Sequence, residues 1–150
     1  MSDSWIVLIP EDPHYVPESA AQVRAKTKLA ELAPGADEVT AKVNDQVQFF
    51  DCGENFSRVF CPSCNAEISM EWWQAKMGED WSDGFKLNKF AVPCCGNLHT
   101  LHELVYDWPQ GFGLFSLEAM NPLIGELLPE PKAELEVILG TRLRLIYQHI

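Results

Sequence analysis

The chain has 150 residues, of which 47% are hydrophobic and 22% charged, so it is long enough for one core and too apolar for wholesale disorder. Its formal net charge is −11 and its pI about 4.6. Such a surface repels phosphate groups, which argues against general binding of nucleic acid or of anionic membranes. We therefore expect a single domain over residues 1–150 whose partner is neither of these.

The N-terminal region carries no sign of export. Met1–Ser4 holds no basic residue, and the apolar run Trp5–Ile9 is shorter than the core of a signal peptide. No apolar stretch approaches the roughly 20 residues of a membrane-spanning helix. We expect a cytoplasmic protein, and in that compartment clustered cysteines are more often metal ligands or redox groups than structural disulfides.

The first half of the chain predicts strands around one helix. Trp5–Ile9 is apolar and rich in residues that favour strands. Pro17 suits the first turn of a helix, and apolar positions then recur at helical spacing as far as Leu32. The expected elements are a buried strand at 5–9, a helix from 17 to 33, and strands at 39–43, 46–50 and 57–60.

The second half predicts a mixture of helices and strands. Ser116 is a good N-cap for a short helix, and Pro131 and Gly140 mark the start and end of another. The expected elements are helices at 66–77, 117–120 and 131–139, and strands at 85–92, 98–106 (with a short helix as the alternative) and 142–149. This order predicts an α+β fold, a ferredoxin-like βαββαβ sandwich in which residues 57–99 form an insertion.

Four of the five cysteines lie in two short clusters, Cys61-Pro62-Ser63-Cys64-Asn65 and Pro93-Cys94-Cys95-Gly96. Each cluster ends in a residue that tolerates a left-handed backbone, Asn65 in the first and Gly96 in the second. A zinc knuckle needs such a tight turn, because the turn points backbone N–H groups at the sulfurs. We therefore predict a structural Zn²⁺ bound by Cys61, Cys64, Cys94 and Cys95.

The first cluster resembles the knuckle of zinc-ribbon and rubredoxin-type sites, with Asn65 where a glycine is more usual. The resemblance covers residues 57–99 and implies a tetrahedral structural zinc held by four thiolates, with Cys61 and Cys64 among them. The second cluster departs from the family pattern, because its two cysteines are adjacent rather than separated by two residues. The fourth ligand is thus open among Cys95, His99, His102 and Cys52, and iron is an alternative to zinc.

The Cys-Pro-Ser-Cys segment also resembles the active site of glutaredoxins and thioredoxins. In that interpretation a helix N-terminus would lower the pKa of Cys61 and make it a nucleophile, and Val92-Pro93 would stand in for the cis-proline segment. The two cysteines that directly follow Pro93 argue against it. A thiol–disulfide oxidoreductase is the alternative function. A second enzymatic alternative is a zinc enzyme whose metal keeps an open position and activates water beside His99 or His102.

The rest of the sequence favours binding over catalysis. It contains no phosphate-binding glycine loop, nucleophile elbow or His-Glu-x-x-His motif. Trp72 and Trp73 cannot both face the core from one helix, so one lies either at a shielded edge of the core or at a recognition surface. We interpret the chain as a small, acidic, zinc-stabilised binding protein with a basic protein as its partner, for example an immunity protein or antitoxin that masks a basic toxin surface.

Overall fold

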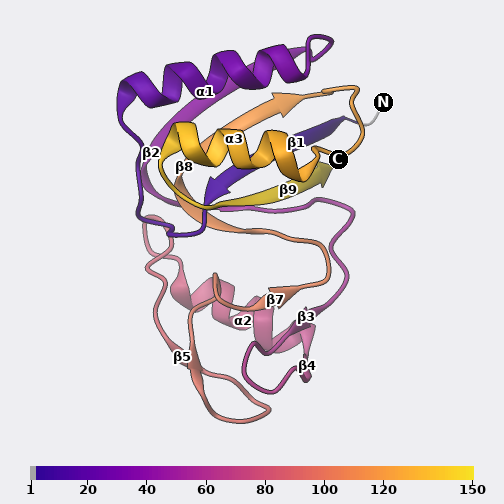
Figure 1. The fold of residues 1–150 in the computed structure, drawn as a ribbon. Coiled ribbons are helices and arrows are strands. Elements are labelled where there is room, and N and C mark those ends of the chain that lie inside the picture. Colours follow the sequence, from indigo (N-terminus) through magenta and orange to yellow (C-terminus); the bar gives the residue numbers. More distant parts are fainter. Residues whose placement is uncertain (1–2) are drawn as a thin grey trace.

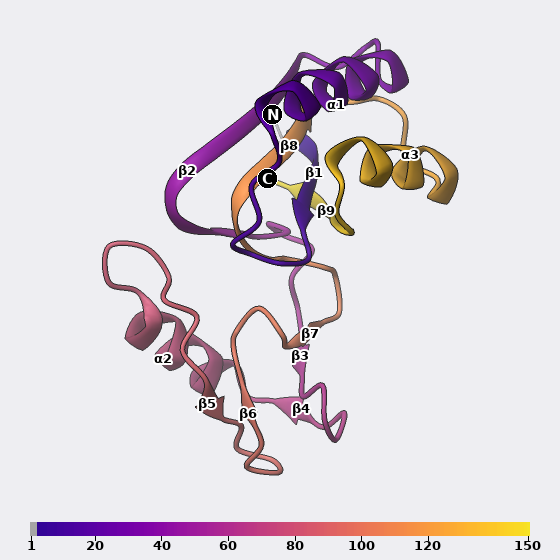
Figure 2. The same ribbon diagram turned by 60° about the vertical axis from the view of Figure 1, so that its left-hand side comes forward.

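The computed structural model describes residues 3–150 and has a mixed α and β architecture. A four-stranded sheet with two helices forms one part of the molecule. Residues 57–109, which we call the cysteine lobe, form a smaller part beyond the end of that sheet (Figure 1). Figure 2 shows that the chain enters the lobe after β2 and returns from it into β8. None of the described helices is long and apolar enough to cross a membrane.

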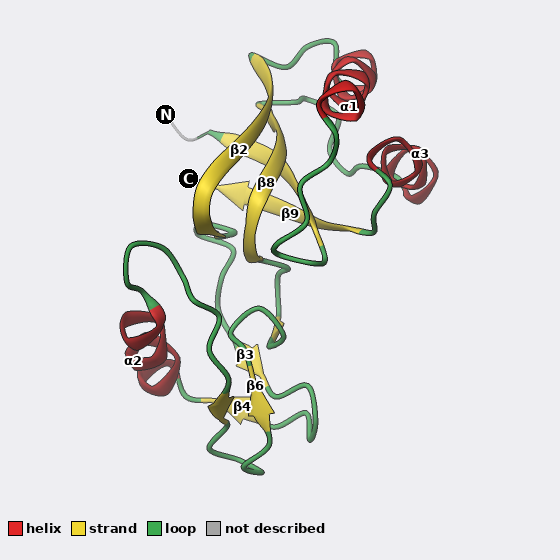
Figure 3. Cartoon of the chain, turned by 90° about the vertical axis from the view of Figure 1, so that its left-hand side faces the viewer, coloured by secondary structure: helices red, strands yellow, loops and turns green. Residues whose placement is uncertain are grey.

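The main sheet has the strand order β2-β8-β1-β9, and all neighbouring strands are antiparallel. Both of its helices cover the same face (Figure 3). Each helix connects two strands that are separated in the sheet by a third one. The elements are β1 (Ser4–Pro10), α1 (Ser19–Leu32), β2 (Glu38–Phe50), β8 (Gly111–Met120), α3 (Pro129–Leu139) and β9 (Leu143–His149).

The core between the sheet and its helices follows from the period-two pattern of the strands. Ile6 and Leu8 of β1 face the helices, whereas Val7 and Ile9 face the other side of the sheet. The buried partners on the helix side come from three further elements, α1 (Ala25, Leu29), β8 (Phe115, Leu117, Ala119) and α3 (Leu135, Leu139). Gly140 ends α3 in the left-handed conformation that the sequence predicts there.

The cysteine lobe is built from very short strands around one helix. Its elements are β3 (Val59–Phe60), β4 (Glu67–Ile68), α2 (Met70–Asp80), β5 (Phe90–Ala91), β6 (Leu98–His99) and β7 (Val105–Tyr106). Trp73 of α2 and Tyr106 lie in the lobe's core, and Trp73 Nε1 donates a hydrogen bond to Tyr106 Oη at 3.0 Å. Phe112 of β8 is fully buried in the same core, so the lobe packs directly on the main sheet.

Two polar side chains fix the lobe. Asp80 is fully buried at the end of α2, where its carboxylate accepts hydrogen bonds from the backbone N–H groups of Leu87 and Asn88. Arg144 of β9 forms an ion pair with Glu11 and donates to the carbonyl of His102 in the lobe at 3.1 Å. The loop after α2 and the seam between lobe and sheet are therefore held by charge-assisted hydrogen bonds.

The predicted short helix at residues 117–120 is wrong. These residues belong to β8, an inner strand of the main sheet whose residues are mostly buried. Ser116 does not cap a helix, since its hydroxyl donates to the carboxylate of Glu118 at 2.6 Å. Pairing with two neighbouring strands and burial against the helices outweigh the capping signal, as tertiary packing commonly does.

Other boundaries also move. The two strands predicted at 39–43 and 46–50 form one strand, β2, with a register shift between Val43 and Gln48. The helix expected from residue 66 begins at Met70 after its N-cap Ser69, and it continues through Gly78 to Asp80. Of the strand predicted at 85–92, only β5 forms. The strand predicted at 98–106 is replaced by two short strands, β6 and β7.

Candidate metal centre

The first cysteine cluster forms the turn of a hairpin between β3 and β4. Cys61 N–H donates to the carbonyl of Ala66, and Asn65 N–H donates to the carbonyl of Cys61, both at 2.9 Å. Asn65 has a φ of 64°, the left-handed conformation that the sequence predicts. Ser63 N–H points at the sulfur of Cys61 at 3.3 Å, as expected of a knuckle.

The second cluster repeats this turn between β5 and β6. Val92 N–H donates to the carbonyl of Asn97, and Gly96 N–H donates to the carbonyl of Val92, both at 3.0 Å. Gly96 has a φ of 77° and takes the place of Asn65. The two turns therefore have the same hydrogen-bond pattern. In this correspondence Val92 occupies the position of Cys61, Cys94 the position of Ser63, and Cys95 the position of Cys64.

The two turns bring four sulfurs together. The Sγ atoms of the predicted ligands all lie within 4.8 Å of one another, and those of Cys61 and Cys95 are 3.7 Å apart. A tetrahedral zinc with Zn–S bonds of about 2.3 Å would separate its sulfurs by about 3.8 Å. The sulfurs of a disulfide lie about 2.0 Å apart. The cluster can hold a metal ion, and its members are Cys61, Cys64, Cys94 and Cys95.

The thiols of this cluster differ in acidity. Burial raises the pKa of Cys61, but the backbone N–H groups of Cys64 and Ser63 outweigh it and lower that pKa to about 6. Burial and the neighbouring sulfurs of Cys64 and Cys61 raise the pKa of Cys94 to about 12. One thiolate forms readily, whereas several together need a cation to offset their repulsion.

The other residues weighed as ligands lie outside this cluster. Both ring nitrogens of buried His102 are engaged, Nε2 with the carbonyl of Glu11 at 2.8 Å and Nδ1 with the N–H of Phe112 at 2.9 Å. The thiol of Cys52 donates to Gln110 Oε1 at 3.3 Å on the far side of the sheet. His99 Nε2 lies 2.6 Å from Ser63 Oγ, which places this ring beside the first turn.

The surroundings of Cys61 differ from those of a thioredoxin-type dithiol. Cys61 lies at the start of a hairpin turn, and α2 begins only at Met70. The low pKa of Cys61 is due first to the backbone N–H groups of Cys64 and Ser63 in this turn, and then to hydrogen bonds with Cys94 and Cys95. The described residues contain no cis peptide bond, so Val92-Pro93 does not reproduce a cis-proline segment.

A register exchange in the second turn tests the equivalence of the two hairpins. Cys94→Ser should lower zinc affinity by roughly tenfold or more. Even the loss of a residue that only hydrogen-bonds a metal ligand lowers metal affinity by about 10–100-fold. Adding Val92→Cys restores the Cys-Pro-Ser-Cys pattern of the first turn, and zinc affinity should recover. Competition with a chromophoric chelator measures both affinities. A double variant that binds no better than Cys94→Ser would show that position 92 does not face the metal.

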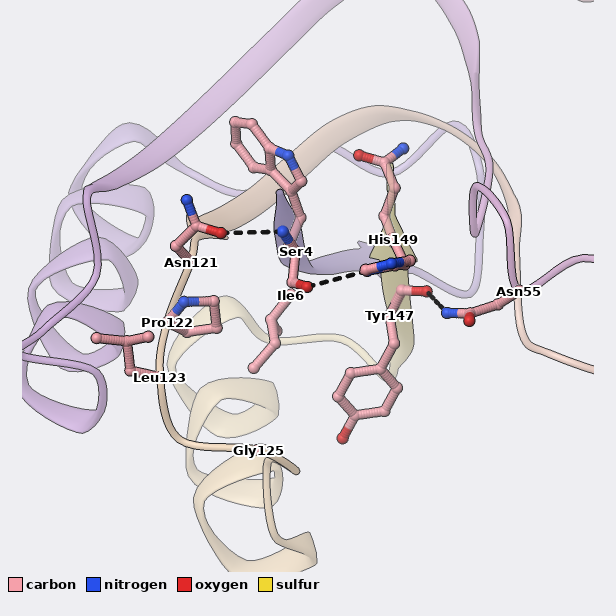
Figure 4. A pocket seen from close by; sticks show the side chains of 11 residues that line it. Ser4, Ile6, Asn55, Asn121, Pro122, Leu123, Gly125, Tyr147 and His149 are labelled. Atoms are coloured by element: carbon pink, nitrogen blue, oxygen red, sulfur yellow. Dashed lines mark hydrogen bonds between the residues drawn. The ribbon is translucent and has the colours of Figure 1, made fainter. Parts of the chain in front are cut away.

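Sequence reasoning missed a cavity of about 430 Å³ at the end of the main sheet where β1 begins and β9 ends (Figure 4). Its lining comes from residues far apart in the chain, among them Ser4, Asn55, Leu123 and His149. No local motif marks these residues, because only the fold brings them together.

Comparisons with models of protein families, with curated proteins and with solved structures find no match for this chain.

Proposed function

We propose that the protein is a zinc-stabilised binding protein whose partner is a basic protein, with an immunity protein or antitoxin as the closest type. The zinc would be structural and held by the four clustered cysteines. The fold would be of the ferredoxin-like type, with the cysteine lobe inserted between its second and third strands. The cytoplasmic location expected from the sequence stays a prediction.

The proposal of a structural zinc rests on one observation: the sulfurs of the four cysteines lie within 4.8 Å of one another. Four thiolates would fill a tetrahedral coordination sphere and leave no position for a water molecule or substrate. Cys61 is also fully buried in the core of the lobe, where a bound metal would join the two hairpins. This arrangement supports stabilisation rather than hydrolytic chemistry.

The strand order supports the ferredoxin-like assignment. Two β-α-β units, β1-α1-β2 and β8-α3-β9, interlock so that β8 and β1 are the inner strands. Both helices lie on one face, as a two-layer sandwich requires.

The acidic surface supports a basic partner. The chain has 22 Asp and Glu residues against 11 Lys and Arg, and within residues 3–150 only four ion pairs join a Lys or Arg to a carboxylate. Most carboxylates are therefore uncompensated, and their field would accelerate encounter with a positively charged surface.

A thiol–disulfide oxidoreductase that uses Cys61 and Cys64 is the second candidate, because the pKa of Cys61 is lowered to about 6 and the sulfur of Cys64 lies within 4.8 Å of it. A thiolate of this kind reacts quickly with iodoacetamide unless a metal protects it. Rapid alkylation of Cys61 in protein purified without chelator would favour this candidate over the structural zinc.

Charge reversal tests the binding proposal. The tagged protein captures partners from a lysate of its own source, and each candidate is purified for stopped-flow kinetics at several salt concentrations. Exchanging the exposed residues Glu31, Glu38 and Asp45 for lysine should slow association roughly tenfold or more at low salt, because steering is electrostatic. The matched glutamine and asparagine exchanges should give a smaller effect. An association rate that changes neither with salt concentration nor with charge reversal would contradict the proposal.

A further inference from the structure

The cavity at the end of the main sheet has a polar end and apolar walls. Figure 4 shows Ile6, Pro122 and Leu123 on one side and the ring of Tyr147 on the other, with Gly125 below. Ser4 and His149 lie at the opposite end, joined by a hydrogen bond of 3.2 Å between Ser4 Oγ and His149 Nδ1. A ligand for this cavity therefore needs an aliphatic or aromatic body that carries a polar head.

The polar end offers hydrogen-bond acceptors. His149 Nε2 lies 3.7 Å from the carboxylate of Glu54, and a proton on Nε2 leaves Nδ1 to accept from the Ser4 hydroxyl. Ser4 Oγ then keeps its lone pairs free to accept from a further donor. Asn55 donates its Nδ2 to the carbonyl of Tyr147 at 3.0 Å, which leaves Oδ1 as a second acceptor. The head of the ligand should thus be a hydrogen-bond donor.

The charges around the cavity are negative. Glu54 contacts His149, and both Asp3 and Asp37 accept hydrogen bonds from the side-chain amide of Asn121 in the lining. No lysine or arginine is among the residues that line the cavity in the described part of the chain. A positively charged head is favoured over a neutral one in this field.

The rim of the cavity is held in an unusual conformation. Leu123 has a φ of 59° and is 81% exposed, and it lies between Asn121 and Gly125, which also have positive φ. A non-glycine residue rarely adopts this region, and such residues cluster at sites that contact ligands. The strained loop presents an apolar side chain to solvent at the mouth of the cavity.

We propose that this cavity receives a lysine or arginine side chain of the protein partner. The aliphatic stem would pack against Ile6, Leu123 and Tyr147, and the cationic head would reach Ser4 Oγ and Asn55 Oδ1. The carboxylate of Glu54, beside His149, would attract the cation through its field. This inference rests on the proposed function, since it names the part of a basic partner that the acidic protein binds.

Short peptides test the proposal on the intact protein. Acetyl-Gly-Arg-Gly-amide, its lysine analogue and its norleucine analogue are titrated to about 10 mM while ¹H–¹⁵N NMR spectra are recorded, a range that suits dissociation constants near 1 mM. The basic peptides should shift the backbone signals of Ser4, Leu123 and His149, and bind at least about fivefold more tightly than the norleucine peptide. Signals that do not move, or equal binding of all three peptides, would overturn the proposal.

Two variants separate the head from the stem. Glu54→Gln should weaken binding of the basic peptides about two- to fivefold and leave the norleucine peptide unaffected, whereas Glu71→Gln on α2 should change neither. Leu123→Gly preserves the backbone conformation, because glycine favours a positive φ. This variant should weaken the binding of all three peptides. Its control is Val137→Ala, on an exposed position of α3 that does not line the cavity.

The purified partner separates failure of this inference from failure of the proposed function. If salt and charge reversal control association but Glu54→Gln and Leu123→Gly leave the dissociation constant unchanged, the cavity proposal is wrong and the proposed function stands. If the basic peptides bind in the cavity while partner association ignores salt, the cavity binds cations and the proposed function is wrong.

Discussion

Chelation of the metal is expected to unfold the cysteine lobe while the main sheet stays folded. The lobe's five strands have two residues each, and its core contains the fully buried Cys61, so we expect the lobe to depend on a metal to join its hairpins. Structural zinc supplies about 10–16 kcal/mol of apparent binding free energy in small domains. The main sheet keeps its own helix-packed core, which contains no cysteine of the cluster.

Amide hydrogen exchange measures this difference. Addition of EDTA should abolish the protection of Val59 and Ile68 in the lobe and preserve that of Ile6 and Leu117 in the main sheet. Cys64→Ser should reproduce the effect without chelator. Ser63→Ala, in the same turn but without a sulfur, should not. Full protection of the lobe in Cys64→Ser would show that the metal does not hold it together.

Acid should destabilise the protein through His102. Burial, together with the charge of Arg144, lowers the pKa of His102 to about 4 from its ordinary 6.5. As the pH falls below 6.5 the unfolded chain takes up a proton at this residue, but the folded chain does not until about pH 4. Stability that is fully present above pH 6.5 is therefore lost toward pH 4, by up to about 3 kcal/mol at 1.36 kcal/mol per pKa unit.

His102→Gln isolates this contribution, because a glutamine amide can still donate toward Glu11 and accept from Phe112 but does not titrate. Urea unfolding at pH values from about 7 to 4.5 should give a smaller loss of stability for this variant than for the wild type. Protonation of the cysteines affects both proteins and cancels in the comparison. Parallel profiles for wild type and His102→Gln would refute the role of His102.

The elements that the sequence predicts well are those with local signals. The apolar run of β1, the helical spacing of α1 and the proline and glycine at the ends of α3 each produce the expected element. The two cysteine turns also form as predicted, because each needs a left-handed residue and Asn65 and Gly96 provide it.

The elements that sequence reasoning misses depend on distant parts of the chain. β8 carries a helix-capping signal at Ser116 but becomes a strand, because β1 and β2 pair with it along both edges and its side chains are buried in the cores on the two faces of the sheet. The sequence makes His102 a candidate metal ligand because it follows Cys95 closely along the chain. In the structure, both of its ring nitrogens are engaged by Glu11 and Phe112. Long-range packing decides these cases, and a single sequence does not contain it as a local pattern.

A structural zinc on the four cysteines can be tested by measuring the metal content of protein purified without chelator, combined with a free-thiol count before and after chelation. We predict one zinc per chain, with about four further thiols becoming reactive when the metal is removed. Protein that contains no metal and carries a readily oxidised Cys61–Cys64 pair would contradict the claim and make the thiol–disulfide oxidoreductase the leading interpretation.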